Sequence, residues 1–320
     1  MTRSSAFICV HLWLFSGLVA PSVAQTTRPA SPEVVPWVEC FPTASKWTNP
    51  VVQGNALWAR DAAIRRCMVT VDVLHPEHLQ PFVAAAPRGL SIIPSLKLTN
   101  LWADWEKGGT SYRHNDPEAW QQIADGVRAA QRICGGYTVG IECEKQMEPV
   151  FKGLCQVNYA QLRESLKPMP RDLEYWWWPG IFWPPDQATR CERWMLGIES
   201  SLGGHVRWID WLKSGWRLHP DLPQNEIDAR YRLLLGASQL APIPIYYGDP
   251  SLGVRPQMTV AGWSADQFRA AIKSSTADIV LIYPGHAGYV PFSRIWSGES
   301  YESVTATRPV DDRALTEREK

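Results

Sequence analysis

Eight short apolar runs alternate with helical patterns along this chain, and that alternation constrains the fold more than any other feature. Each run is long enough for a buried strand and too short for an independent helix. The predicted strands cover residues 34–40, 68–74, 90–98, 137–143, 173–178, 206–211, 243–247 and 279–283.

Helical patterns fill most of the intervening segments. Asp116 followed by Pro117 gives one helix a capping residue and a proline in its first turn. Eight strands that alternate with helices predict a single-domain (β/α)8 barrel of the TIM type. An open doubly wound sheet is the rival, but no Gly-x-Gly-x-x-Gly follows the first strand, so a dinucleotide-binding variant lacks support. The predicted helices cover residues 55–66, 76–85, 117–134, 158–166, 225–240 and 265–274.

The first 24 residues are typical of a secretory signal peptide. Arg3 is the only charge before an apolar run over residues 7–20, and Ser22-Val23-Ala24 offers a small-residue cleavage site. We therefore expect a secreted or periplasmic protein with no membrane span after cleavage. The remaining chain divides into a linker at residues 25–33, the barrel at 34–304 and a charged flexible tail at 305–320.

Charge and cysteine content narrow the class of partner. The 32 basic and 32 acidic residues balance, which argues against nucleic acid and against an anionic membrane surface. Six cysteines follow the predicted signal peptide, an even number that permits disulfides in an exported chain. Cys155 and Cys191 are the pair we expect, since both follow predicted strands. No Cys-x-x-Cys exists, and we predict neither a metal nor a cofactor.

Two glutamates end the fourth predicted strand. Glu142 and Glu144 share one face because side chains alternate along a strand. In a barrel the carboxyl ends of all strands meet at one mouth, where catalytic groups gather. Asp210 and Asp249 end or follow the sixth and seventh predicted strands. At the same mouth, Lys97 and Tyr247 could donate hydrogen bonds to a ligand.

Tryptophan is the second signal, with 17 residues in the chain. Aromatic ring faces beside carboxylates suit sugars, whose C–H faces stack on rings while their hydroxyls reach polar groups. We therefore expect an oligosaccharide or polysaccharide substrate. Trp176 and Trp177 are adjacent and must face opposite ways, so at least one ring of the 176–178 run packs against a helix. The rings we expect to bind sugar are Trp102, Trp105, Trp177 and Trp178.

Residues 139–146 resemble the strand-four signature of chitinase-like family 18 barrels. In that register Val139 replaces the first Asp, Glu142 and Glu144 replace two further Asp residues, and Gln146 falls where the family has its proton-donating Glu. Since Gln cannot donate that proton, a strict carry-over implies a sugar-binding barrel without hydrolase activity. More generally the chain resembles exported barrel glycoside hydrolases, whose acid/base Glu commonly ends strand four.

The sequence thus predicts a glycoside hydrolase in which Glu142 and Glu144 act as general acid/base and Asp249 or Asp210 supplies the opposite carboxylate. One alternative is a non-catalytic carbohydrate-binding barrel, which Gln146 favours. The other is a metal-dependent barrel hydrolase or isomerase that uses Glu142, Glu144, Asp249 and His286, since carboxylate and imidazole suit divalent ions.

Overall fold

The computed structural model describes the greater part of eight strands and their neighbouring helices, and every structural statement below concerns those residues. They are residues 32–39, 64–86, 88–98, 116–143, 150, 157–178, 185–203, 205–210, 243–247, 265–274, 277–283 and 298. All of them belong to one compact unit, Ser31–Lys320.

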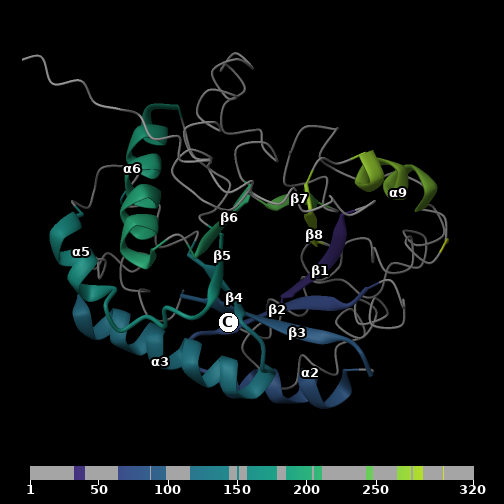
Figure 1. Ribbon diagram of the computed structural model, residues 1–320, viewed down its shortest axis with the longest axis horizontal. Coiled ribbons are helices and arrows are strands. Elements are labelled where there is room, and N and C mark those ends of the chain that lie inside the picture. The colour runs from purple at the N-terminus through teal and green to yellow at the C-terminus, as the bar shows by residue number, and fades with distance from the viewer. Residues whose placement is uncertain are drawn as a thin grey trace, which may run out of the picture. The chain divides into compact units, whose positions relative to one another are not determined.

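The described strands form one parallel sheet that curls on itself (Figure 1). Each strand pairs with the next along the chain, and β8 pairs in parallel with β1, which closes the ring. Parallel strands with helices between them make this an α/β protein with a TIM-barrel-like sheet. The predicted α/β class and the barrel-like sheet are therefore confirmed. The strands are β1 (Glu33–Glu39), β2 (Arg66–Asp72), β3 (Ser91–Lys97), β4 (Thr138–Glu142), β5 (Glu174–Trp178), β6 (Val206–Asp210), β7 (Ile243–Tyr247) and β8 (Ile279–Tyr283).

Helical segments follow five of these strands. Asp116 caps the longest predicted helix by accepting a hydrogen bond from the Glu118 amide, and Gly135 ends it at a φ of 68°. That geometry matches the sequence prediction. The helical segments are the 3-10 helix η3 (Pro76–Leu79), α2 (Gln80–Ala85), α3 (Pro117–Cys134), α5 (Tyr159–Ser165), α6 (Pro185–Leu202) and α9 (Ala265–Ser274).

Two helix predictions differ from the structure. The α6 helix was missed, because Pro184 and Pro185 indicate a loop although proline is tolerated in the first turn of a helix. The helix predicted at 55–66 overlaps β2 at Arg66, which pairs with Ser91 of β3, and its residues 55–63 lie outside the described residues. The helix predicted at 225–240 lies outside the described residues.

Side chains alternate between two cores along β1, β2, β3, β5 and β6. On β2, Val69 and Val71 belong to an outer core between the sheet and the helices, whereas Met68 belongs to the core inside the barrel. The same alternation places Trp177 in the outer core and Trp176 and Trp178 in the inner one. Because successive side chains of a strand point to opposite faces, Trp177 faces the helices while Trp176 and Trp178 face the barrel interior.

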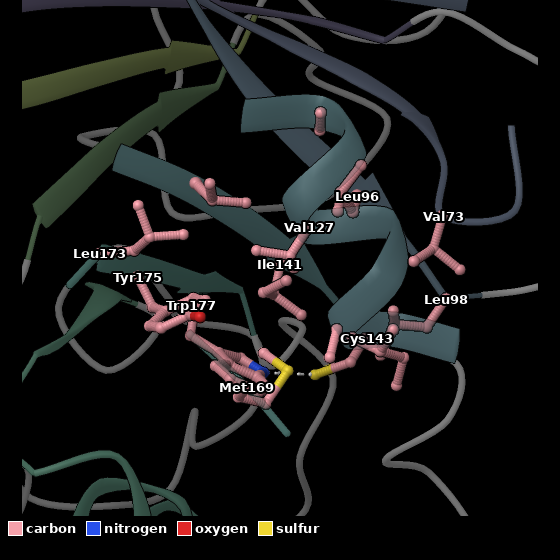
Figure 2. Close-up of a cluster of buried hydrophobic side chains, with 14 of the residues drawn as sticks. Val73, Leu96, Leu98, Val127, Ile141, Cys143, Met169, Leu173, Tyr175 and Trp177 are labelled. Carbon is pink, nitrogen blue, oxygen red and sulfur yellow. Dashed lines mark hydrogen bonds between the residues drawn. The ribbon is translucent and has the colours of Figure 1, made fainter. Parts of the chain in front are cut away.

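The outer core is rich in aromatic rings. Trp177 lies among the apolar side chains of β3, β4 and α3, with its indole N–H donating to the Cys143 sulfur over 2.9 Å (Figure 2). It also contacts Trp120 of α3, Trp194 of α6 and Trp208 of β6, with ring centroids 5.8 to 6.3 Å apart. Part of the high tryptophan content thus joins the helix layer to the sheet, since each buried ring removes a large apolar area from water.

Candidate active site

Three charged residues occupy the last inward-facing positions of three neighbouring strands. Asp72 lies four residues beyond Met68, and Lys97 lies four beyond Ile93; both Met68 and Ile93 belong to the inner core. Because side chains alternate with period two, Asp72 and Lys97 face the inside of the barrel as well. Glu142 completes the row as the register partner of Lys97 on β4.

The register fixes the order of this row across the sheet. Asp72 pairs with Lys97, Lys97 pairs with Glu142, and Glu142 pairs with Trp178. The ladder continues past the row, because the Val73 amide donates to the Lys97 carbonyl at 3.0 Å and the Leu98 amide donates to the Glu142 carbonyl at 3.0 Å. The backbone therefore holds the three charged residues at one level of the barrel.

Lys97 and Glu142 form an ion pair. The Lys97 Nζ lies 2.8 Å from the Glu142 Oε1, and the two side chains are 27% and 5% exposed. Glu142 is thus withdrawn from solvent while the lysine ammonium keeps partial access to it. Partly buried charges in contact, at the barrel end where active sites form, are a functional-site candidate with a physical rationale.

Asp72 is fixed by the turn that ends β2. Its Oδ1 accepts a hydrogen bond from the Leu74 amide at 2.8 Å, and its carbonyl accepts one from the His75 amide at 3.0 Å. This Asx-type turn stops the strand two residues before the predicted end at residue 74. The residue as a whole is 7% exposed.

Two tryptophans and a threonine border the charged row. The Trp37 indole N–H donates to the Thr70 hydroxyl at 2.6 Å, and the Trp37 ring meets the Trp178 ring edge to face at 5.5 Å. All three side chains are buried. Because Trp178 is the register neighbour of Glu142, an aromatic wall stands beside the ion pair.

Small residues form the layer beneath the row. Gly140 precedes Glu142 on the inner face, and a Cβ at that position would lie 2.9 Å from both the Cβ and the Oγ of Ser95 and 3.1 Å from the Met68 sulfur. Ser95 and Thr70 are buried at the same level. Glycine is therefore required for β3 and β4 to carry their side chains this close together.

The predicted site residues divide into three groups. Glu142, Lys97 and Trp178 lie together at the carboxyl end of the barrel. For Asp210 and Tyr247 the structure describes the strand ends but not the side chains. Outside the described residues lie Glu144, Asp249, Trp102, Trp105, Gln146 and His286.

Trp177 does not fit its predicted role as a sugar platform. Its side chain is 0% exposed and packs in the outer core, away from the barrel mouth. A ring that stacks on a sugar needs one free face, so this prediction is corrected. Conversely, sequence reasoning missed Asp72, although the alternation Met68, Thr70, Asp72 was available. The predicted strand ran to residue 74 and left Asp72 inside it.

The described residues contain no group of three or more His, Cys, Asp or Glu side chains arranged to hold a metal ion. Within them, no helix is long and apolar enough to cross a membrane. Cys67, Cys134 and Cys143 are thiols rather than halves of a disulfide. Burial raises the pKa of both Cys67 and Cys134 to about 12. The predicted Cys155–Cys191 bridge lies outside the side chains that the structure describes.

No family model and no curated protein matches this chain. Among solved structures it is similar to a protein from Toxoplasma gondii described as a deoxyribose-phosphate aldolase, with 10% identity and a TM-score of 0.44 over 84% of this chain and 94% of that one. It is also similar to a dihydropteroate synthase from Xanthomonas albilineans, with 13% identity and a TM-score of 0.36 over 83% and 92%.

The prediction of a glycoside hydrolase is wrong. Neither solved structure named above is a glycosidase, and no family model supports the resemblance of residues 139–146 to family 18. The geometry gives a physical reason. A general acid must hold a proton, whereas the Lys97 ammonium 2.8 Å away stabilises Glu142 as a carboxylate. What the chain shows is a TIM-barrel-like protein with an ion pair at the carboxyl end of its sheet.

Proposed function

We propose that the protein is a complete (β/α)8-barrel enzyme that transfers a proton at a carbon next to the carbonyl group of a small substrate. The observation that carries this proposal is the Lys97–Glu142 ion pair at 2.8 Å, on adjacent strands at the carboxyl end of the sheet. Barrel enzymes place their chemistry at this end.

The two groups have complementary roles in such a reaction. The Glu142 carboxylate takes a proton from the substrate carbon, and the electron pair of the broken C–H bond forms a carbon–carbon double bond. The carbonyl electron pair moves onto oxygen, where the Lys97 ammonium stabilises the negative charge by a hydrogen bond. Return of a proton from Glu142 to the same carbon, with the oxygen electron pair re-forming the carbonyl, completes the exchange.

Stability alone is a weak reason for this ion pair. Taking a lysine and a glutamate out of water costs free energy that their attraction only partly offsets, and apolar residues often serve a core equally well. The pair also occupies the mouth-side layer, where a barrel core no longer needs filling. Trp178 beside Glu142 supports a small substrate with an apolar part, because its buried ring limits access by water.

The test is the exchange of substrate protons for deuterium. The full chain is incubated in D2O with a panel of small aldehydes, ketones and 2-oxo acids, and loss of the proton next to the carbonyl is followed by NMR. We expect exchange with at least one compound, and Glu142→Gln and Lys97→Met should each slow it about 100-fold or more.

A matched pair elsewhere on the chain provides the control. Lys167 and Glu164 also form an ion pair, but their side chains are 65% and 64% exposed on the outside of the barrel. Glu164→Gln and Lys167→Met should leave the exchange rate within about twofold of wild type, as expected for surface pairs. Equal rates in the Glu142 and control variants, or no exchange with any compound, would refute the proposed function.

We also propose that the chain is exported after cleavage of residues 1–24. Arg3 and the apolar run at residues 7–20 support this. The mature protein should begin at Gln25, which amino-terminal sequencing of the native protein tests. A native amino terminus at Met1 would rule cleavage out.

A further inference from the structure

We propose that His75 and His78, on the turn that follows β2, bind a divalent transition-metal ion through their imidazole nitrogens, with Glu77 orienting the His75 ring. This turn includes the 3-10 helix η3 and follows the carboxyl end of β2. The metal site uses none of the residues of the Lys97–Glu142 pair, and it does not depend on the proposed function.

The spacing of the two histidines is the first argument. His75 caps η3, and the His78 amide donates to the His75 carbonyl at 3.1 Å. A 3-10 helix has three residues per turn, so side chains three positions apart lie one above the other. The two rings are accordingly stacked, with centroids 5.4 Å apart and planes 23° from parallel. A metal ion binds a histidine nitrogen at about 2.0 to 2.1 Å, so rotation of two rings on one turn is enough for both to reach the same ion.

Glu77 sets the tautomer of His75, which is the second argument. The His75 Nδ1 lies 3.0 Å from the Glu77 Oε1. An ionised carboxylate can only accept a hydrogen bond, so Nδ1 carries the hydrogen and Nε2 of the neutral ring keeps a lone pair for a metal ion. Histidines that bind metals commonly donate their other ring N–H to a carboxylate in this way, which fixes the ring and makes it a better ligand.

The exposure of the turn indicates which ions fit. The side chains of His75 and Glu77 are 52% and 54% exposed, and His78 is half-buried. Within the described residues no third His, Cys, Asp or Glu completes a closed cluster, so water supplies the remaining ligands. Imidazole suits Cu²⁺, Ni²⁺ and Zn²⁺, whereas Mg²⁺ and Ca²⁺ prefer oxygen ligands. Cu²⁺ binds most tightly among the divalent ions of the first transition row and is therefore the probe of choice.

The first test maps histidine reactivity in the full-length wild-type protein. Diethyl pyrocarbonate labels accessible imidazole nitrogens, and peptide mass spectrometry reports each histidine separately. We expect one equivalent of Cu²⁺ to cause loss of labelling at His75 and His78. His205, an exposed histidine directly before β6, should stay labelled. Mg²⁺ at the same concentration should protect none of the three.

Calorimetric titration with Cu²⁺ then identifies the ligands. His75→Asn and His78→Asn should each raise the dissociation constant about tenfold or more, because two ligands on one turn reinforce each other and one ligand alone does not. Glu77→Ala should raise it about tenfold, the low end of the range for losing a carboxylate behind a metal-binding histidine. His205→Asn is the matched control and should leave the dissociation constant unchanged.

Two results would overturn the proposal. One is equal protection of His75, His78 and His205 by Cu²⁺, or protection of the pair by Mg²⁺. That result comes from the wild-type protein, so it decides the matter even if a substitution prevents folding. The other is a wild-type dissociation constant in both His75→Asn and His78→Asn. Neither experiment uses a carbonyl substrate, so their outcome is independent of the proton-exchange assay.

Discussion

The two ends of the barrel interior are both charged, but they are built from different cations. At the amino end, Arg66 donates two hydrogen bonds to Glu33 at 2.7 and 2.6 Å and lies over the Trp176 ring at 5.0 Å. At the carboxyl end, Lys97 meets Glu142 at 2.8 Å through a single ammonium. A guanidinium fixes a carboxylate with its planar fork, whereas a lysine is a compact charge on a flexible stem.

The second arginine of the amino end repeats this contrast. Arg207 is buried and pairs with Asp278, which precedes β8. The Trp176 indole also donates to Glu174 at 2.6 Å, so Glu33, Glu174 and Asp278 each accept a hydrogen bond from a side chain at this end. We conclude that the amino end closes the barrel with fixed ion pairs, while the carboxyl end holds the Lys97–Glu142 pair on which the proposed function rests. This division matches the general one in TIM barrels.

The largest effect should come from Trp176, the ring beneath Arg66. Trp176→Ala should lower the free energy of unfolding by about 3 to 5 kcal/mol, because it empties a fully buried site in the barrel. Denaturant unfolding measures this. Trp177→Ala is the matched variant, since it removes a neighbouring ring of the same size from the outer core.

The two tryptophan variants should differ in their coupling to Arg66. In a double-mutant cycle, Arg66→Met should cost about 0.5 to 1 kcal/mol less beside Trp176→Ala than in wild type, because the cation–π contact has already gone. Beside Trp177→Ala its cost should be unchanged. Equal coupling energies with both rings would mean that the contact between Arg66 and Trp176 makes no specific contribution to the stability of the amino end.

Arg207→Met should have the next largest effect. It removes a hydrogen bond between charged groups, and we expect a loss of about 1.5 to 3 kcal/mol in the free energy of unfolding. Proton exchange should remain within about twofold of wild type, because Arg207 lies at the opposite end of the interior from Lys97. A large loss of exchange in a folded Arg207→Met protein would contradict the division between the two ends.

Gly140→Ala tests the packing beneath the ion pair at the carboxyl end. The added methyl group meets Ser95 at 2.9 Å, so we expect about 1 to 2 kcal/mol of destabilisation from overpacking and a displaced ion pair above it. Slower proton exchange should accompany it. Adding Ser95→Gly should restore part of both, since it removes the atoms that collide. If the double variant is no better than Gly140→Ala, then Ser95 is not what limits this position.

Much of the fold could be predicted from the sequence because period two is a local signal. All eight predicted strands are present, and the interior and exterior faces of the 176–178 run follow from alternation alone. The strand ends were less certain. At β2, one hydrogen bond from the Leu74 amide to Asp72 ends the strand early, and apolar residues that continue to Leu74 conceal this.

The site could be predicted only in part. Glu142 and Lys97 follow from strand ends, but their pairing depends on which residue of β3 lies opposite which residue of β4, and sequence gives no register. Because the register was unknown, the lysine partner of Glu142 was not foreseen, and Glu142 was assigned as a proton donor. Trp177 was misassigned because the sequence does not show whether a tryptophan at a strand end points into the barrel or toward the helices that cover the sheet.

The smallest effect should be a dependence of stability on acid at the amino end. Burial raises the pKa of Asp278, but the hydrogen bond and the positive charge of Arg207 outweigh it, so the pKa of Asp278 lies below its ordinary value. A carboxyl group with a lowered folded-state pKa stabilises the protein above its unfolded-state pKa, which is about 3.9. That contribution is lost as the pH falls through the folded-state value.

The free energy of unfolding should therefore decrease more between pH 6 and pH 3 in wild type than in Arg207→Met, in which the pKa of Asp278 is no longer lowered by the arginine. Asp278 is half exposed, so solvent screens the pair and the difference should be modest. Parallel denaturant titrations at several pH values measure it. If both proteins lose stability in parallel, the Arg207–Asp278 pair does not contribute to acid sensitivity, and the amino end owes its stability to the Arg66–Glu33 fork and the Trp176 ring.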